Sequence, residues 1–192
     1  MKQTKLSIAT AFTIIASFVL LLALPATTLA DNVCRLDQRQ MQHPGAFLLG
    51  GRTVLGQTFI PSAPGHRVCQ VKVMIQKNAF NADNLTLHIV GSNFAELDAS
   101  VTIPGGPIPM GNSVQVFDFG CNGVALAGRP FYGLKLESPG SAAGAYSWQG
   151  SAGNLYARPG ADVRGFRNAN GGKGKWESLG AWDYAFEIYM CD

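Results

Sequence analysis

Short runs in which polar and apolar residues alternate restrict the fold of this chain more than any other feature. In the clearest run, residues 68–76, every second residue is apolar: Cys69, Val71, Val73 and Ile75. A period of two places apolar side chains on one face of an extended strand. Comparable runs occur at residues 54–60, 85–90, 113–119, 131–138 and 182–191, and Gly, Pro and Asn residues separate them.

These runs predict an all-β protein, because no segment shows a sustained helical period. Our prediction is an antiparallel jelly-roll-type β-sandwich of about 7–9 strands, with a barrel as the alternative. Residues 31–51 are expected to be irregular, and residues 94–99 to form a helical turn or a loop. The three prolines among residues 104–109 exclude regular structure there.

The first thirty residues predict a cleaved signal peptide that precedes the fold. Lys2 and Lys5 give a positive start, an apolar stretch follows, and the segment ends in small residues with cleavage expected after Ala30. An uncleaved membrane anchor is the alternative. The predicted organisation is therefore a signal peptide at residues 1–30 and one sandwich domain at residues 31–192. It implies a bacterial protein that is secreted or periplasmic.

The net charge of the chain argues against nucleic acid as a partner. Loss of Lys2 and Lys5 with the signal peptide leaves 13 of the 15 basic residues against 12 acidic ones, a net charge of about +1. A nearly neutral chain lacks the electrostatic footprint of a nucleic-acid-binding protein. No stable membrane span is expected after cleavage, and the oligomeric state stays open.

All four cysteines (Cys34, Cys69, Cys121 and Cys191) lie after the cleavage site. An even number of cysteines in an exported chain predicts two disulfides, whereas a zinc site would favour pairs of closely spaced cysteines. Four cysteines allow three pairings. We favour Cys69–Cys121 with Cys34–Cys191, because the second bond would join the two ends of the domain.

Residues 146–182 contain all three tryptophans of the chain, separated by glycine, serine and asparagine. We interpret this stretch as a rim of loops that presents aromatic rings to a glycan, since flat sugar faces stack on such rings. The alternative is that the rings belong to the core, which we favour for Trp182. The residues predicted to bind the ligand are Tyr146, Trp148, Gln149, Asn154, Tyr156, Arg158 and Trp176.

The same stretch carries five basic residues that could hold an acidic polysaccharide. A solvated loop surface is the alternative. These residues are Arg158, Arg164, Arg167, Lys173 and Lys175.

A succession of strands and aromatic residues extends over residues 54–190: G-Q-T-F at 56–59, C-Q-V-K-V at 69–73, L-T-L-H-I at 85–89, V-F-D-F at 116–119, F-Y-G-L-K-L at 131–136, Y-S-W at 146–148, Trp176, and W-D-Y-A-F-E-I-Y at 182–189. In this succession the chain resembles secreted bacterial jelly-roll modules of the carbohydrate-binding and galactose-binding-like kind. Such modules are mostly accessory or surface domains without catalysis, which the resemblance implies here.

Catalytic signatures are missing from the sequence. It contains neither the G-x-S-x-G of a serine hydrolase nor the H-E-x-x-H of a metalloprotease. A polysaccharide hydrolase or lyase would need two facing carboxyl groups, and the candidates are Asp118, Glu137, Asp183 and Glu187. For Glu187, a cross-strand pair with Lys72 or Lys135 is the simpler interpretation.

No catalytic residue and no cofactor are therefore predicted. A structural calcium ion at Asn81, Asp83 and Asn84 is a weaker alternative to a plain turn. The preferred function is a non-catalytic, exported glycan-binding module. A structural or protein-interaction surface domain is the alternative, and a small polysaccharide-active enzyme comes third.

Overall fold

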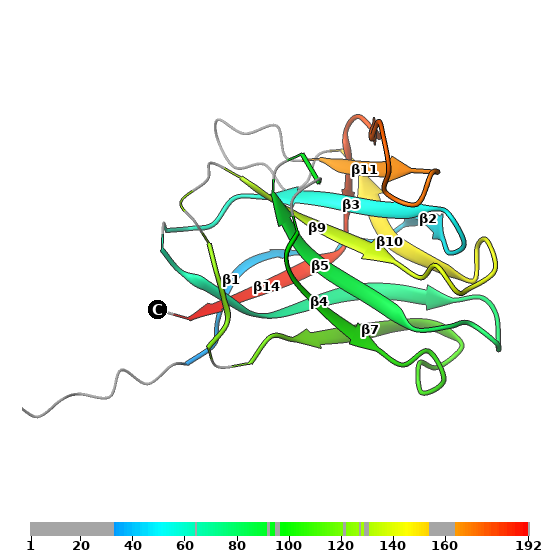
Figure 1. Cartoon of the computed structure of the whole chain (residues 1–192), viewed down its shortest axis with the longest axis horizontal. Helices are drawn as coiled ribbons and strands as arrows, with labels where there is room; N and C mark the ends of the chain where they lie inside the picture. Colours follow the sequence, from blue (N-terminus) through cyan, green and yellow to red (C-terminus); the bar gives the residue numbers. More distant parts are fainter. Residues whose placement is uncertain are drawn as a thin grey trace, which may run out of the picture. The chain divides into compact units, whose positions relative to one another are not determined.

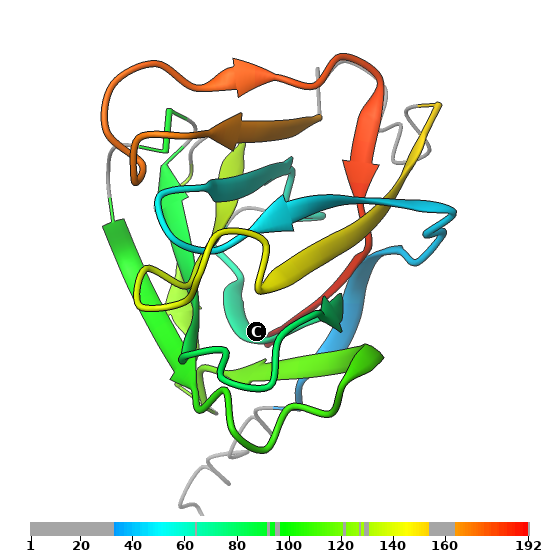
Figure 2. The same ribbon diagram turned by 90° about the vertical axis from the view of Figure 1, so that its right-hand side faces the viewer.

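The computed structural model describes residues 33–63, 65–91, 93–94, 97–120, 122–126, 128, 131–153 and 164–191. These residues form an all-β sandwich of two antiparallel sheets, and they contain no helix that could cross a membrane (Figures 1 and 2). The first sheet has the order β1-β14-β4-β10-β13, with β2 also paired to β10 and with β7 and β8 also paired to β4. The second has the order β12-β11-β3-β9-β5-β6.

The strands of the first sheet are β1 (Arg35–Gln40), β2 (Gly45–Leu49), β4 (Arg67–Lys77), β7 (Gly111–Asp118), β8 (Val124–Ala125), β10 (Tyr146–Ala152), β13 (Trp182–Tyr184) and β14 (Phe186–Cys191). Those of the second are β3 (Val54–Phe59), β5 (Leu85–Gly91), β6 (Leu97–Ile103), β9 (Tyr132–Glu137), β11 (Gly165–Asn168) and β12 (Glu177–Ser178). The all-β sandwich prediction is confirmed, although the strands in the described residues outnumber the seven to nine expected.

Strand β4 organises the first sheet, as its strong alternation leads one to expect. Val71, Val73 and Ile75 are fully buried, whereas Gln70 and Lys72 on the opposite face are half-buried. The strand is 11 residues long and pairs with β7 along one edge and with β14 and then β10 along the other. Each of the other expected runs also contains a strand. In residues 113–119 the protein core covers only the face that carries Phe117, since Val114 and Val116 on the opposite face are each 43% exposed.

Two expectations about irregular segments are wrong. Residues 31–51 include β1 and β2, and β6 begins at residue 97, within the segment 94–99 that was expected to be a helical turn or a loop. In β1 the core-facing positions are Gln38 and Gln40, which are only 5% exposed. Their side-chain amides donate to the carbonyls of Ile60 and Asp183, so burial of these polar groups is compensated. A polar strand of this kind has no apolar alternation to reveal it.

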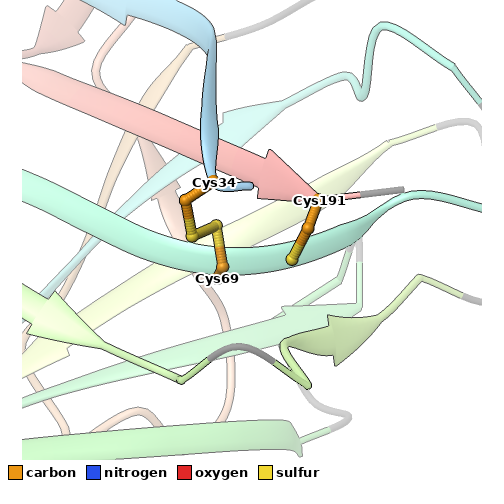
Figure 3. Close-up of side chains that lie close together, drawn as sticks. All are labelled: Cys34, Cys69 and Cys191. Carbon is orange, nitrogen blue, oxygen red and sulfur yellow. A yellow bond between two sulfur atoms is a disulfide. The ribbon is translucent and has the colours of Figure 1, made fainter. Parts of the chain in front are cut away.

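The cysteine pairing that we favoured is also wrong. Cys34 forms a disulfide with Cys69, with 6.1 Å between their Cα atoms (Figure 3). The bond fastens the start of β1 to the central strand β4. Cys121 lies outside the described residues. A disulfide is compatible with an extracellular or periplasmic location.

Candidate functional site

Tyr146 and Trp148, the first aromatics of the predicted rim, lie in the core instead. Both are 0% exposed, because residues 146–152 form β10 in the middle of the first sheet. The Trp148 ring stacks on Tyr184 with 4.5 Å between ring centroids, and its Nε1 donates to the Ala185 carbonyl at 3.0 Å. Neither side chain can contact a ligand in this fold, so these two rim assignments need correction.

Gln149 points away from Trp148, because successive residues of a strand face opposite sides of the sheet. Its amide donates to Gln76 on the neighbouring strand β4 at 3.2 Å, and the residue is 5% exposed. Gln149 is therefore part of the outer face of the first sheet and does not share a rim with the tryptophans. The predicted ligand residues Asn154, Tyr156 and Arg158 lie outside the described residues.

Trp176 is half-buried on the outer face of the second sheet. It stacks on Phe94 with 4.4 Å between centroids, and Phe94 also contacts Phe166 at 5.2 Å. Phe94 lies over a floor of two glycines: a Cβ added at Gly56 or Gly133 would come within 2.6 Å of its ring. Trp176 thus covers an aromatic cluster, and part of its surface stays open to solvent.

Trp182 belongs to the closing strands, as we favoured. It packs edge-on against Phe47 at 4.9 Å and fills space above Gly45 and Gly150 on adjacent strands. Added Cβ atoms at these glycines would come within 2.8 Å of the indole. The glycines of this region therefore make room for a ring inside a sheet and do not mark loops.

A groove of about 420 Å³ opens beside this aromatic group. We call it the β2–β11 groove, because its lining comes from β2, the following turn, β11 and the residue after β11. The half-buried Phe47 and Arg167 both line it. The lining residues are Ala46, Phe47, Leu48, Thr53, Arg167 and Ala169.

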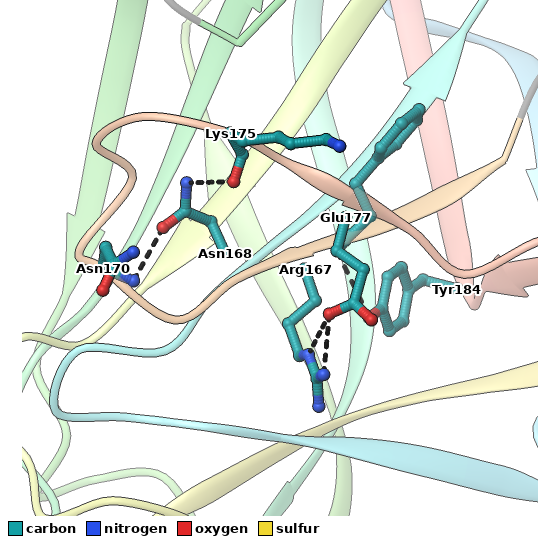
Figure 4. A network of polar contacts seen from close by, with 7 residues as sticks. Arg167, Asn168, Asn170, Lys175, Glu177 and Tyr184 are labelled. Carbon is teal, nitrogen blue, oxygen red and sulfur yellow. Dashed lines mark hydrogen bonds and ion pairs between the residues drawn. The ribbon is translucent and has the colours of Figure 1, made fainter.

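The strand register of β11 directs the Arg167 side chain. Arg167 pairs with Leu55 of β3, so its side chain leaves β11 on the same face of the sheet as the buried Leu55. On the other side it lies opposite Glu177 of β12. Nε and Nη2 donate to Glu177 Oε2 at 3.2 and 2.7 Å, and Figure 4 shows the two side chains pointing toward one another beside Tyr184.

The loop that joins β11 to β12 is shaped by a buried asparagine. Asn168 is 2% exposed, and its amide donates to the carbonyls of Lys173 and Lys175 at 3.1 and 3.3 Å. Its Oδ1 accepts from the Asn170 N–H at 2.8 Å (Figure 4). These bonds close the hairpin and hold Glu177 opposite Arg167, while both lysine residues remain exposed.

Tyr184 supplies an uncharged neighbour to the Arg167–Glu177 pair. Burial raises the pKa of Tyr184 well above that of an ordinary tyrosine, and the Arg167 guanidinium lowers it only in part. The phenol therefore stays protonated at neutral pH. Among the described residues, Glu177 alone supplies a charge to Arg167, and Arg167 Nη1 has no protein partner there. The groove thus combines a partly exposed ring with an unused, preorganised donor.

The four candidate acids do not make a common cleft. Glu187 lies on the outer face of the first sheet with Arg39 at 3.1 Å and Lys72 at 3.6 Å, and it pairs across the strands with Lys72 as expected. Glu137 lies on the second sheet with His88 at 2.8 Å and Lys135 at 3.2 Å. Asp183 Oδ1 accepts from Gln57 in the interior, and Asp118 Oδ1 accepts from Gly120 in an exposed turn.

His88 is nearly buried and lies next to an acidic side chain of the neighbouring strand β9. It is 8% exposed, and its Nε2 lies 2.8 Å from Glu137 Oε1. The hydrogen bond from His88 and the nearby Lys135 ammonium lower the pKa of Glu137, whereas burial opposes them. This pair is a stabilising element of the second sheet.

Replacement of Glu137 by glutamine should lower the free energy of unfolding by about 1 kcal/mol at pH 7. The pKa of folded Glu137 lies below its ordinary value of 4.5, so its stabilisation is present above that value and is lost as the pH falls through the lower, folded-state pKa. Urea unfolding at pH 7 and pH 3 measures the difference. Glu177→Gln is the control, because that side chain is 63% exposed. A Glu137→Gln difference that persists unchanged at pH 3 would contradict the assignment.

Comparison with known proteins does not assign the chain to a family. No family model matches the chain, and the curated proteins contain no match to it.

Proposed function

We propose that the protein is an exported, non-catalytic module that binds an acidic glycan in the β2–β11 groove. The observation that carries the proposal is the meeting of Phe47 and Arg167 in one groove of about 420 Å³. That volume lies within the range of small-ligand sites, which combine apolar walls with a few placed polar groups. The proposal keeps the glycan ligand expected from the sequence and moves its site from the tryptophans to the edge of the sandwich.

Each lining group has a distinct part in this proposal. The half-buried Phe47 ring, held edge-on by Trp182, offers an apolar surface to the C–H face of a sugar. The planar guanidinium of Arg167 matches a carboxylate, such as that of a uronic acid, through the donors that Glu177 does not use. Glu177 is a positioning residue, since it holds the guanidinium in place and does not itself line the groove.

Arg167→Gln should weaken the binding of a carboxylate-bearing oligosaccharide about 10- to 100-fold, the range expected for loss of hydrogen bonds to a charged group. Isothermal titration with oligogalacturonate, and with an uncharged oligosaccharide of the same length, measures this. Lys173→Gln is the matched control, because it removes an exposed charge from the same hairpin away from the groove lining. Equal losses in both variants would mean that general attraction, not this groove, binds the glycan.

A protein-interaction domain is the second candidate function. It is favoured by β7, which lies at an edge of the first sheet and exposes Val114 and Val116 by 43% each. Sheet edges are natural sites for adding a strand from a partner. If no oligosaccharide of either charge binds, and if Val116→Lys abolishes self-association or capture of an extended peptide, this function replaces the first.

A further inference from the structure

The turns at one end of the sandwich expose large apolar side chains. Phe80, in the turn between β4 and β5, is 83% exposed, and Met110, in the turn between β6 and β7, is 42% exposed. Figure 1 shows these two turns, together with the turn between β9 and β10, at the end of the domain toward which β4 points. We call this surface the apolar tip. It consists of residues 78–82, 104–110 and 139–145.

The three turns of the apolar tip are bound to one another. The backbone N–H of Asn78 donates to the Ala145 carbonyl at 2.8 Å, and its side-chain amide donates to the Gly144 carbonyl at 3.1 Å. Gly105 lies directly against the Ala82 carbonyl, where a side chain would not fit. The turns therefore form one connected surface, from which the Phe80 ring projects.

Many backbone polar groups of the apolar tip have partners inside the protein. Lys77 is 4% exposed, and its Nζ donates to the carbonyls of Gly105 and Ile108 at 2.7 and 3.0 Å. Three backbone N–H groups donate to carbonyls of their own turns, those of Ala82, Ile108 and Ala145. Four residues are prolines, which have no N–H group: Pro104, Pro107, Pro109 and Pro139. The tip therefore leaves water at a lower cost than a loop whose polar groups depend on solvent.

The charge distribution favours one kind of partner. The apolar tip contains no Asp, Glu, Lys or Arg. The exposed Arg52 lies beside it, because a Cβ added at the preceding Gly51 would contact Ala143. A protein partner usually surrounds an apolar contact with a polar and charged rim that fixes its orientation. A lipid bilayer instead accommodates a projecting ring without a preformed pocket, and aromatic rings are enriched at its interface.

We propose that the apolar tip docks the protein reversibly on a lipid bilayer. Phe80 and Met110 enter the boundary between headgroups and acyl chains, and Arg52 lies at the level of the headgroup phosphates. The few inserted side chains provide a weak, peripheral contact. This inference does not depend on glycan binding in the β2–β11 groove.

Flotation of the full protein with phosphatidylcholine vesicles tests the proposal. The unchanged protein should float with the vesicles. Phe80→Asp should lower its partition coefficient about 10- to 100-fold, the factor that corresponds to burial of one phenylalanine side chain. Met110→Asp should act in the same direction. Because both residues are exposed, the urea unfolding midpoint should not change in either variant.

Leu36→Asp is the matched control, since it places the same charge at an apolar residue that is 48% exposed. Leu36 pairs with Tyr189, which pairs with Gln70 near the start of β4, whereas the apolar tip begins where β4 ends. Leu36→Asp should therefore float with the vesicles as the unchanged protein does.

Three outcomes overturn the proposal. One is an unchanged protein that does not float with the vesicles. Another is flotation of Phe80→Asp and Met110→Asp at the level of the unchanged protein. The third is a dimer, detected by light scattering without vesicles, that Phe80→Asp converts to a monomer while no form floats; the tip would then bind a second copy of the chain. Titration with oligogalacturonate is a separate measurement, so either proposal can fail without the other.

Discussion

Replacement of Trp148 by alanine should lower the free energy of unfolding by about 3–5 kcal/mol, the usual cost of truncating a buried tryptophan. The side chain is among the largest that are fully buried, and it packs between the sheets against Tyr184. Truncation leaves a cavity and removes the bond from Nε1 to the Ala185 carbonyl. Since domains are stable by about 5–15 kcal/mol, this loss consumes a large part of the total.

Urea unfolding of the purified variants measures the effect. Trp176→Ala is the matched control, since Trp176 lies in the same stretch of sequence but is half-buried and stacks on a single ring, Phe94. We expect its loss of stability to be less than half as large. Equal stability of Trp148→Ala and the unchanged protein would be incompatible with a core position for Trp148.

The second large effect concerns the disulfide. Replacement of both Cys34 and Cys69 by serine should lower the free energy of unfolding by about 3–4 kcal/mol in the loop-entropy account of cross-links. The two residues are 35 positions apart, so the bond closes a loop of moderate length in the unfolded chain. It also ties β1, a strand with few apolar residues, to the centre of the first sheet.

Urea unfolding without reductant compares the double variant with the unchanged protein. The dependence of the unfolding free energy on urea should become steeper in the variant, because an unfolded chain without the cross-link exposes more surface. The double variant is needed because Cys34→Ser alone leaves Cys69 within 4.8 Å of Cys191. An unchanged unfolding midpoint would show that the bond does not constrain the unfolded chain.

The all-β fold could be predicted because strands that face both a core and solvent alternate in sequence. β4, β5 and β9 follow this pattern and were located to within about two residues, as is usual for strand ends. β1 could not be located in this way, because glutamine side chains occupy its core-facing positions and bond to backbone carbonyls. Only the three-dimensional placement of those carbonyls makes the strand possible.

The sequence of β10 alternates between inward-facing and outward-facing residues, but its glycine and serine residues suggested a loop. Tyr146, Trp148 and Gly150 point inward, and Ser147, Gln149 and Ser151 occupy the outer face, which is a period of two. Gly150 suggested a loop, yet it lies in the strand because the Trp182 indole occupies the space of a side chain. Small residues next to large rings can therefore indicate close packing of a sheet as well as a turn.

The β2–β11 groove could not be predicted from the sequence, because it depends on two strands from different sheets that are far apart along the chain. Arg167 was considered only as one of five basic residues in a loop. Its pairing with Glu177 follows from the β11–β12 hairpin, whose Asn-Gly-Gly turn residues are the one local signal for it. The approach of Phe47 from β2 has no sequence signal at all.

The pairing of β1 with β14 determines when the domain can fold. Residues 35–40 lie against residues 186–190, so the first sheet stays incomplete until the last residues of the chain are present. Contacts between distant segments fold slowly, because the intervening chain must be ordered before they form. We expect a nascent chain to remain unfolded along the first sheet, and to depend on chaperones, until residues 186–191 are released.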